Sequence, residues 1–527
     1  MKGPLTRRHF LNLVGAAGGA TAIYQTSLAL GLLPETGPAP KLNLMQVGRN
    51  SKKVVILGAG VAGLTVAYEL ERAGYDCTIV EASRRIGGRI ITFRHGDVVD
   101  EMGYNQVCNF DDQPHLYFNG GAARIPGHHH RALHYCKKLG VELEIMANDN
   151  RLAWTQDDNA FNGDPVRIRQ YTSDARGFMS ELLHKAVDKN VFETPLTDED
   201  KERLLEFVKA YGDLNDNAVY KGTERAGFES GGFLKHGELK GTLDFSEILK
   251  SRFWRYGMHF NEAEFWAAPL LTPKGGMDNV IRAFVRNIRS PIVLNAQVQS
   301  IQLKSDGVDV VYNHDGRRKK VSADYCFNSI PSHFINGIPN NFSPDYAHAL
   351  ATMLQRNFFK IGFQMKERFW ERQGIYGGIW FTGQEINEIW YPSHGIHQQK
   401  GVVLGAYAFG PEQSNKFERM HPQERLRFAA EQGNKVHPGY SDYIENGISV
   451  PWGRMNHMMG CGNRFEPEDA DRYLKLLQKP DGNHYMIGDQ ISYHSSWQEG
   501  AYASALHAIG DLDRRVRAET STTGVKR

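Results

Sequence analysis

Residues 53–89 decide the fold of this chain and read KVVILGAGVAGLTVAYELERAGYDCTIVEASRRIGGR. Residues 54–57 are an unbroken apolar run, which is typical of a strand buried on both faces. A G-x-G-x-x-G turn follows at residues 58–63, and residues 64–73 have helical composition. A second apolar run at residues 77–80 completes the unit. The order of strand, glycine turn, helix and strand predicts a dinucleotide-binding βαβ unit and an α/β fold.

The glycines of the turn and the acid after the second strand each have a physical role in this unit. Gly58 permits the tight turn, Gly60 lets a pyrophosphate approach the backbone, and Gly63 lets the helix pack closely on the strand. Glu81 is placed to accept hydrogen bonds from the ribose of an adenosine, while the phosphates lie at the helix N-terminus. The predicted cofactor contacts in this unit are Gly58, Gly60, Val61, Ala62, Gly63, Glu81 and Ala82.

A second glycine pair distinguishes FAD from NAD. Residues 82–89 read A-S-R-R-I-G-G-R, in which the glycines allow a close approach to a diphosphate and Arg89 faces it. The pattern E-A-S-x-R-x-G-G-R resembles the flavin-containing amine oxidase superfamily, and this resemblance implies FAD as the cofactor.

Length and composition exclude some classes of protein. At 527 residues the chain is too long for one ordinary core, so about two or three domains are expected. The hydrophobic fraction of 41% and the charged fraction of 23% are typical of globular proteins. A net charge of only +2 gives no basis for a nucleic-acid partner or for binding to an anionic membrane.

The N-terminus predicts export. Residues 6–11, TRRHFL, resemble a twin-arginine signal, and residues 12–33 form its mildly apolar section. We expect a signal at residues 1–33, a polar linker at residues 34–50, and a periplasmic or secreted protein with no stable membrane association after export. The Thr-rich residues 516–527 predict a disordered tail.

A second flavin motif lies near the C-terminus. Gly488 and Asp489 follow a short apolar run, and Trp497-Gln498-Glu499-Gly500-Ala501 begins a helix. A reduced flavin is anionic near N1 and O2, and a helix N-terminus offers unpaired N–H groups to that anion. The predicted contacts here are Gly488, Asp489, Ser496, Trp497, Gln498, Glu499, Gly500 and Ala501.

A third motif indicates the substrate class. Residues 119–126, NGGAARIP, resemble the G-x-x-R-I/L-P segment of L-amino-acid oxidases, here taken as bacterial members of the superfamily. The resemblance implies that Arg124 clamps the substrate carboxylate, and a five-donor guanidinium suits such a two-point contact. It also implies flavin contacts at Gly121, Ala122, Ala123 and Arg124. Venom-type members have Pro-Met where this chain has Ala122-Ala123, and glycine where it has Ser496.

The resemblance implies roles for several further residues. Lys360 would hold a water at flavin N5, and Tyr407 would give the carboxylate a second hydrogen bond. Trp497 would form an aromatic wall, the Ser496 carbonyl would accept from the substrate amine, and Val298 would contact the adenine. Side-chain preference is expected to depend on the surroundings of Phe409.

The expected architecture is an amine oxidase fold with a Rossmann-like FAD-binding domain built from discontinuous segments. A mixed-sheet substrate-binding domain and a helical insertion complete it. The predicted ranges are 51–90, 262–345 and 452–515 for the FAD-binding domain, 91–150 and 346–451 for the substrate-binding domain, and 151–261 for the helical domain. The run His128-His129-His130 is not expected to bind metal, because consecutive side chains point in different directions.

The sequence therefore predicts an FAD-dependent L-amino-acid oxidase whose partners are an L-amino acid and dioxygen, with a homodimer as the expected assembly. Products would be a 2-oxo acid, ammonia and hydrogen peroxide. Three alternatives stay open: a flavin amino-acid 2-monooxygenase that forms an amide, a monoamine or polyamine oxidase, and a flavin-binding protein without catalysis. No general base is assigned.

Overall fold

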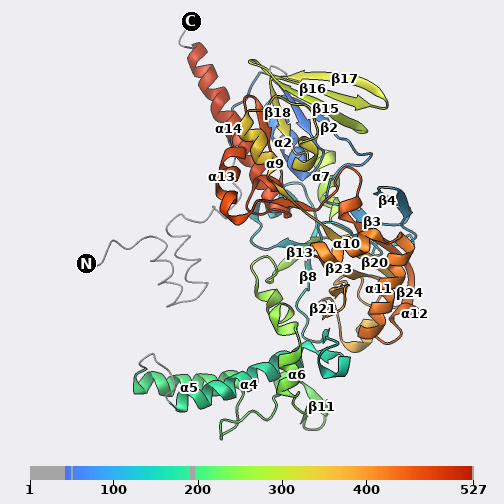
Figure 1. Ribbon diagram of the computed structural model, residues 1–527, viewed down its shortest axis with the longest axis vertical. Helices are drawn as coiled ribbons and strands as arrows, with labels where there is room; N and C mark the ends of the chain where they lie inside the picture. The colour runs from blue at the N-terminus through green and yellow to red at the C-terminus, as the bar shows by residue number, and fades with distance from the viewer. Residues whose placement is uncertain (1–41, 49–51, 190–195, 525–527) are drawn as a thin grey trace.

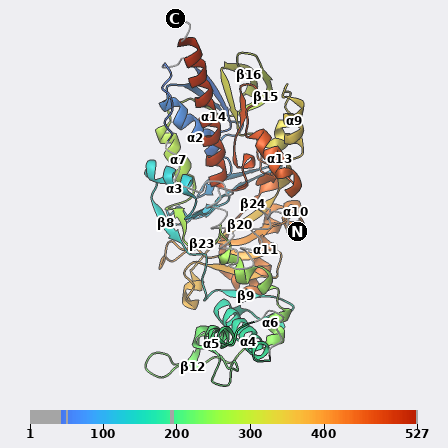
Figure 2. The ribbon, with the colours of Figure 1, turned by 90° about the vertical axis from the view of Figure 1, so that its left-hand side faces the viewer.

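The structure is a computed structural model that describes residues 42–48, 52–189 and 196–524 (Figure 1). The predicted signal at residues 1–33 lies outside the described residues. Two sheet-based parts stack along the long axis, and a helical arm projects sideways from the far end (Figures 1 and 2). The expected α/β architecture, with a Rossmann-like unit and a mixed sheet, is confirmed.

The first part contains a parallel sheet of five strands in the order β14-β2-β1-β18-β26. These strands come from three distant parts of the chain. Parallel strands need long crossover connections, so segments far apart in the sequence pair side by side. Helix α2 (Val61–Arg72) connects β1 and β2, the two strands of the glycine-turn unit. The strands are β1 (Lys53–Leu57), β2 (Asp76–Val80), β14 (Ile292–Val293), β18 (Tyr325–Asn328) and β26 (His484–Met486).

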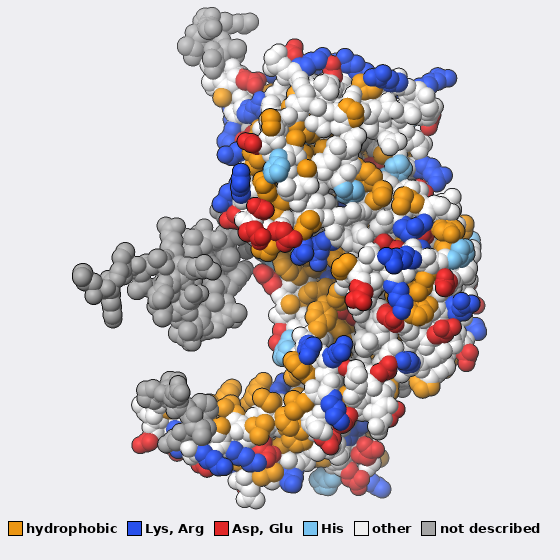
Figure 3. Space-filling model, in the orientation of Figure 1, with side chains coloured by type: hydrophobic (Ala, Val, Ile, Leu, Met, Phe, Trp, Pro, Cys, Tyr) orange, Lys and Arg blue, Asp and Glu red, His pale blue; other side chains and the backbone are white. Residues whose placement is uncertain are grey.

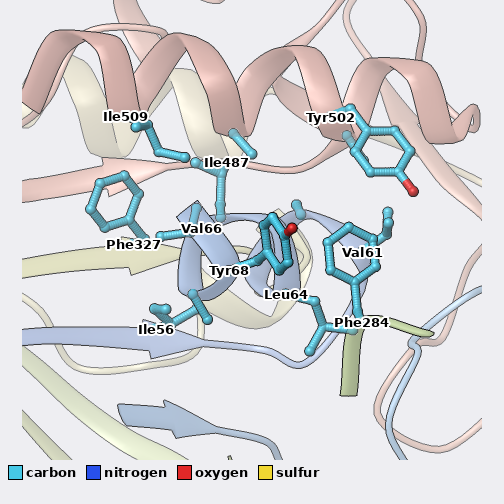
Figure 4. Close-up of a cluster of buried hydrophobic side chains, with 14 of the residues drawn as sticks. Ile56, Val61, Leu64, Val66, Tyr68, Phe284, Phe327, Ile487, Tyr502 and Ile509 are labelled. Atoms are coloured by element: carbon cyan, nitrogen blue, oxygen red, sulfur yellow. The ribbon is translucent and has the colours of Figure 1, made fainter. Parts of the chain in front are cut away.

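Strand β1 is buried on both faces, as its apolar run predicted. Val54 and Ile56 pack in one core cluster with α2, α7 (Asp278–Asn287) and α14 (Gln498–Gly524), part of which Figure 4 shows. Val55 and Leu57 belong to a second cluster with β15 (Ala296–Leu303) and β16 (Val308–His314). The alternation of side chains along a strand therefore places both clusters against one run of four residues.

The second part is a mixed sheet of seven strands in the order β10-β9-β21-β22-β23-β20-β24. Its two faces contact different core clusters. A β-bulge interrupts the pairing of the neighbouring strands β20 and β23, since Ile361 lies opposite Ala406 but Gly362 lies opposite Leu404. The strands are β9 (Trp154–Gln156), β10 (Val166–Arg167), β20 (Phe358–Met365), β21 (Ile379–Thr382), β22 (Glu388–Trp390), β23 (Gly401–Phe409) and β24 (Ile444–Pro451).

The helical arm consists mainly of α4 (Ile168–Asp188) and α5 (Asp198–Gly212), which pack side by side (Figures 1 and 2). The Thr197 hydroxyl accepts from the Asp200 N–H at 3.1 Å, as the capping pattern at residues 197–200 predicted. Hydrophobic side chains gather on the arm in Figure 3, and Met179 and Phe207 are among the exposed ones. The helical section starts later than residue 151, because β9 and β10 belong to the second sheet.

Two predictions about chain ends are wrong within the described residues. Helix α14 continues to Gly524, so the expected disordered tail from residue 516 is helical over most of its length. Residues 42–48, expected as a polar linker, pack against the first core cluster through Leu42, Leu44, Met45 and Val47. The Met45 N–H donates to Asp513 Oδ1 at 2.7 Å, so a hydrogen bond connects residues 42–48 to helix α14.

A buried ion pair ties β4 (Val98–Glu101) to α11 (Pro422–Val436). The Arg425 guanidinium donates to both carboxylate oxygens of Glu101, at 2.8 and 2.6 Å, and both side chains are 0% exposed. Arg454 Nε also donates to Glu101, at 3.0 Å. Two charged groups without access to water are tolerated because their hydrogen bonds are nearly complete.

We expect Glu101→Gln to lower the free energy of unfolding by about 3–5 kcal/mol, because Arg425 would be left as an uncompensated buried charge. Denaturant unfolding followed by circular dichroism measures this change. The control is Glu199→Gln, whose partner Arg203 and whose own side chain are 71% and 70% exposed, and which should change stability by less than about 1 kcal/mol. Equal effects of the two variants would contradict the assignment.

Candidate active site

A cavity of about 590 Å³ opens at the carboxyl ends of the parallel strands, where α/β sheets bind their ligands. Its wall contains most residues predicted to contact the cofactor. These are Gly58, Gly60, Val61, Ala62, Glu81, Ala82, Arg89, Ala122, Val298, Gly488, Asp489, Ser496, Trp497, Gln498 and Ala501. Gly63, Gly121, Ala123, Arg124, Glu499 and Gly500 do not line it.

The glycine turn leaves room for an anion at the start of α2. A Cβ on Gly60 would meet no atom within 4 Å, whereas a Cβ on Gly63 would lie 2.1 Å from the Gly58 carbonyl oxygen. No side chain caps α2 and no acid lies in its first turn. The unpaired N–H groups at the start of α2 therefore border the cavity, which suits a pyrophosphate. Gly63 allows the close helix–strand packing that was expected of it.

Glu81 is oriented by the backbone around it. Its two carboxylate oxygens accept from the Ala59 N–H at 2.7 Å and the Ser83 N–H at 2.8 Å. The side chain is buried and lines the cavity. Each oxygen keeps a further lone pair, so the carboxylate can accept from ribose hydroxyls as predicted.

Arg89 makes its main contact with protein groups. Its guanidinium forms a two-point pair with Asp489, with one contact at 2.9 Å, and donates to the Cys461 carbonyl at 2.8 Å. Asp489 Oδ2 also accepts from the Ser496 N–H at 2.6 Å. The two flavin motifs, about 400 residues apart in the chain, are thereby joined directly at the cavity wall.

The residues missing from the wall serve the structure around it. Glu499 accepts from the Arg131 and Ala132 N–H groups at the start of α3 (His130–Lys138), at 3.1 and 2.9 Å. A Cβ on Gly500 would lie 2.2 Å from Ser492 Oγ, and one on Gly121 would lie 1.9 Å from the Arg89 carbonyl oxygen. The Glu499 side chain therefore caps α3 and the two glycines allow close packing, while the contacts of these residues with the cofactor stay predictions.

Arg124 lies just before β7 (Ile125–Pro126), inside a cage of three indoles. Its guanidinium carbon lies 3.3 Å from the ring centroid of Trp266, 4.8 Å from that of Trp497 and 5.2 Å from that of Trp390. Cation–π contacts stabilise the charge in part. The side chain is 7% exposed, and burial lowers the pKa of Arg124 to about 10.

This guanidinium forms no ion pair with any residue that the structure describes, although the buried Glu388 carboxyl acts on its charge from a distance, and its Nε has no hydrogen-bond partner. Trp497 belongs both to the cage and to the wall of the large cavity. A buried cation without a carboxylate is costly unless a ligand supplies one. The site therefore suits an anionic ligand between Arg124 and the cofactor cavity.

Lys360 and Tyr407 lie opposite each other on β20 and β23, on the sheet face that contacts this cage. Lys360 Nζ donates to the Gly121 carbonyl at 2.6 Å and lies 4.7 Å from the Tyr407 ring centroid. Burial and the nearby Arg124 charge lower the pKa of Lys360 to about 7. Phe409 follows on the same face, with its ring 5.2 Å from that of Tyr407.

Ser496 stands where the resemblance expects glycine, and its backbone explains that expectation. Its φ is +69°, a left-handed conformation that favours glycine. Its hydroxyl is buried without a hydrogen-bond partner. Its N–H is held by Asp489, and this fixes the turn before Trp497.

The sequence reasoning missed Trp266, Tyr256 and Glu388. Glu388 is 1% exposed, accepts from Trp390 Nε1 at 2.7 Å, and has a second carboxyl oxygen without a partner. Burial raises the pKa of Glu388 to about 8. An acid within the apolar run at residues 386–391, INEIWY, was the available signal.

The histidine run lies beside the aromatic cage. The His129 ring centroid is 5.1 Å from that of Trp497, and burial beside other cations lowers the pKa of His129 to about 2. Within residues 42–48, 52–189 and 196–524, no group of three or more His, Cys, Asp or Glu side chains is arranged to hold a metal ion. In the same part of the chain, no helix has the length and apolar character that crossing a membrane requires.

The lowered pKa of Lys360 predicts a pH dependence of stability. Between about pH 7 and 10.5 the unfolded chain holds a proton on this lysine that the folded protein has released. The wild type should therefore gain stability over Lys360→Met as pH rises through this window, by up to about 1.4 kcal/mol per pH unit. Denaturant unfolding of both proteins at matched FAD content tests this, and a difference independent of pH would contradict it.

Comparison with known proteins identifies the family. Residues 61–509 match the family described as flavin containing amine oxidoreductase. The L-amino-acid oxidase of Pseudechis australis is 27% identical over 497 residues, which cover 89% of this chain and 88% of that protein. The enzyme of Gloydius halys is 27% identical over 503 residues, which cover 90% and 91%. Both relatives are snake proteins, so a bacterial source for this chain stays a prediction.

Solved structures agree on the fold. A putrescine oxidase variant superposes with a TM-score of 0.61 at 17% identity, covering 88% of this chain and 99% of that one. Cyclohexylamine oxidase from Brevibacterium oxydans gives a TM-score of 0.59 at 16% identity, with the same coverage. Since the family match spans most of the chain and the cavity fits a dinucleotide, this protein belongs to the flavin-containing amine oxidoreductases and is an FAD-dependent oxidase.

Proposed function

We propose that this chain is an L-amino-acid oxidase that converts L-amino acids to 2-oxo acids, ammonia and hydrogen peroxide. The observation that carries the proposal is the buried guanidinium of Arg124, which forms no direct ion pair with any described residue and shares Trp497 with the cofactor cavity. A substrate α-carboxylate supplies the missing charge in a two-point contact. An amine without a carboxylate leaves the cation uncompensated.

The chain's own residues orient the substrate. Arg124 and the Tyr407 hydroxyl hold the carboxylate, and the Ser496 backbone carbonyl accepts from the amine. Trp497 forms one wall of the site, and Lys360, with its pKa near neutrality, holds a water as the resemblance implies. The substrate ammonium must lose a proton before reaction. FAD held along the cavity wall would supply the redox chemistry, as acceptor of the hydride from the substrate Cα and donor of electrons to dioxygen.

Competing reactions differ in their products. A 2-monooxygenase would release carbon dioxide and an amide, whereas the proposed oxidase releases peroxide and ammonia in equal amounts. An amine oxidase would turn over amines that lack a carboxylate, and Arg124 argues against this. A flavin-binding protein without catalysis would keep its flavin oxidised when L-amino acids are added without oxygen. Export through residues 1–33 and a homodimeric assembly are proposals that rest on the sequence alone.

Arg124→Met should raise the KM for L-amino acids about 100-fold while FAD stays bound, because about 3 kcal/mol of charge-assisted hydrogen bonding is lost. Peroxide production under a substrate series measures KM, and the flavin absorbance measures occupancy. Arg167→Met is a matched control: its guanidinium also stacks on an indole, 3.7 Å from Trp154, with a pKa lowered to about 10. An unchanged KM for Arg124→Met would remove the carboxylate clamp from the proposal.

Arg89→Met should weaken FAD retention, because Asp489 would lose the partner that holds it beside the Ser496 N–H. We expect at least about a tenfold loss of affinity, equal to about 1.4 kcal/mol. Flavin content after gel filtration, taken from the visible and ultraviolet absorbance, measures it. Arg94→Met removes a comparable two-point pair with Asp278 away from the cavity wall and should retain FAD; equal loss in both variants would refute the assignment.

A further inference from the structure

We infer that Glu388 accepts a hydrogen bond from the terminal group of the substrate side chain. It would thereby select L-amino acids whose side chain ends in an N–H donor, either a carboxamide or an ammonium group. This inference rests on the proposed function and deepens it by naming a substrate class. Its basis is the position of the unpartnered carboxyl oxygen of Glu388 relative to Arg124.

Glu388 points to the same side of the second sheet as the predicted substrate residues. In β22, Glu388 and Trp390 are two positions apart and so share a face. Trp390 lies opposite Leu404, which pairs with Gly362, two positions from Lys360. The intervening Ile389 packs in the core cluster on the other face. The sheet therefore presents Glu388 and Lys360 to one space.

Trp390 connects Glu388 to the carboxylate clamp. Its ring centroid lies 5.2 Å from the Arg124 guanidinium carbon, and its Nε1 donates to Glu388 Oε2 at 2.7 Å. An amino acid held at Arg124 by its carboxylate has its side chain next to this indole. A side chain that follows the indole ends at the carboxyl group of Glu388.

The space beside Glu388 has room for such a side chain. A smaller cavity of about 270 Å³ is lined by Glu388 together with Tyr256, Phe381 and Phe409. The aromatic rings suit the methylene groups of a side chain, and the polar group at the wall suits its end. Phe409 is the residue around which the sequence predicted side-chain selection.

The second oxygen of Glu388 is the polar atom that lacks a partner. Glu388 Oε1 is buried and accepts no hydrogen bond from any described residue. Buried carboxyl oxygens without a partner cost free energy, and a site built to pair with a substrate group rejects analogues that lack it. An N–H donor from the ligand completes the hydrogen bonding of this group.

The two kinds of N–H donor differ in their response to pH. The charged and titratable groups around Glu388 are Arg124, Lys360, Tyr256 and Tyr407, with Asp157 and Arg252 across the smaller cavity. Burial raises the pKa of Glu388 to about 8. A carboxamide pairs with either form of the carboxyl group, whereas an ammonium group requires the carboxylate. Preference for an ammonium side chain should therefore increase as pH rises through about 8.

The experiment compares kcat/KM of the holoenzyme for L-glutamine, L-lysine and L-norleucine, with Glu388→Leu, Glu388→Met and Glu388→Gln as variants. The two apolar variants should lower kcat/KM for the preferred polar substrate about 10- to 100-fold relative to L-norleucine. Glu388→Gln keeps an acceptor without charge, so it should retain L-glutamine turnover and lose L-lysine turnover. Glu385→Gln, at a half-buried acid paired with Lys416 and Gln432, is the control with unchanged ratios.

Three results would overturn the inference. One is an equal fall for all three substrates, which indicates a structural role. Another is an unchanged ratio in folded, FAD-loaded variants. The third, which needs no variant, is a wild-type preference for L-norleucine over both polar substrates. These results differ from failure of the proposed function, in which the wild type makes no peroxide with any L-amino acid.

Discussion

The structure depends on the close approach of α2 to β1 at Gly63. A Cβ at this position would lie 2.1 Å from the Gly58 carbonyl oxygen, so only glycine allows the helix to start where it does. That start places the uncapped N-terminus of α2 at the edge of the parallel sheet. The cavity, the Glu81 carboxylate and the Arg89–Asp489 pair are arranged around this point. The position of the cofactor thus follows from one helix–strand contact.

Selectivity depends on a different device, a cation buried among aromatic rings. Three indoles shield Arg124 from water, and the contacts they make with its guanidinium are cation–π contacts. A carboxylate from the protein would neutralise the guanidinium and close the site to a ligand. By holding its acids elsewhere, with Asp489 on Arg89 and Glu388 on Trp390, the chain keeps this charge available.

Local motifs allowed much of the fold and cofactor site to be predicted, because their residues act through the backbone within one short stretch. The turn at residues 58–63 and Glu81 are of this kind. Trp266, Tyr256 and Glu388 escaped prediction because their role arises from contacts between segments far apart in the chain. For Glu499, the helix N-terminus indicated a residue near the ligand but not the direction of its side chain, which accepts hydrogen bonds at the start of α3. The tail was misjudged because the helix continues outward from the buried Val516, and Arg517 and Glu519 form hydrogen bonds with Asn43 and Lys52, which are distant in the sequence.

The bulge between β20 and β23 determines which side chains of β23 face the proposed substrate site. Pairing skips Gly405, since Ala406 faces Ile361 while Leu404 faces Gly362. Alternation along a strand has a period of two, so one unpaired residue reverses the phase of everything after it. If Gly405 were paired as an ordinary strand residue, Tyr407 and Phe409 would turn toward the opposite core and Ala406 and Ala408 would take their places. Leaving this one glycine out of the pairing thus decides whether the binding chamber is walled by aromatic rings or by methyl groups.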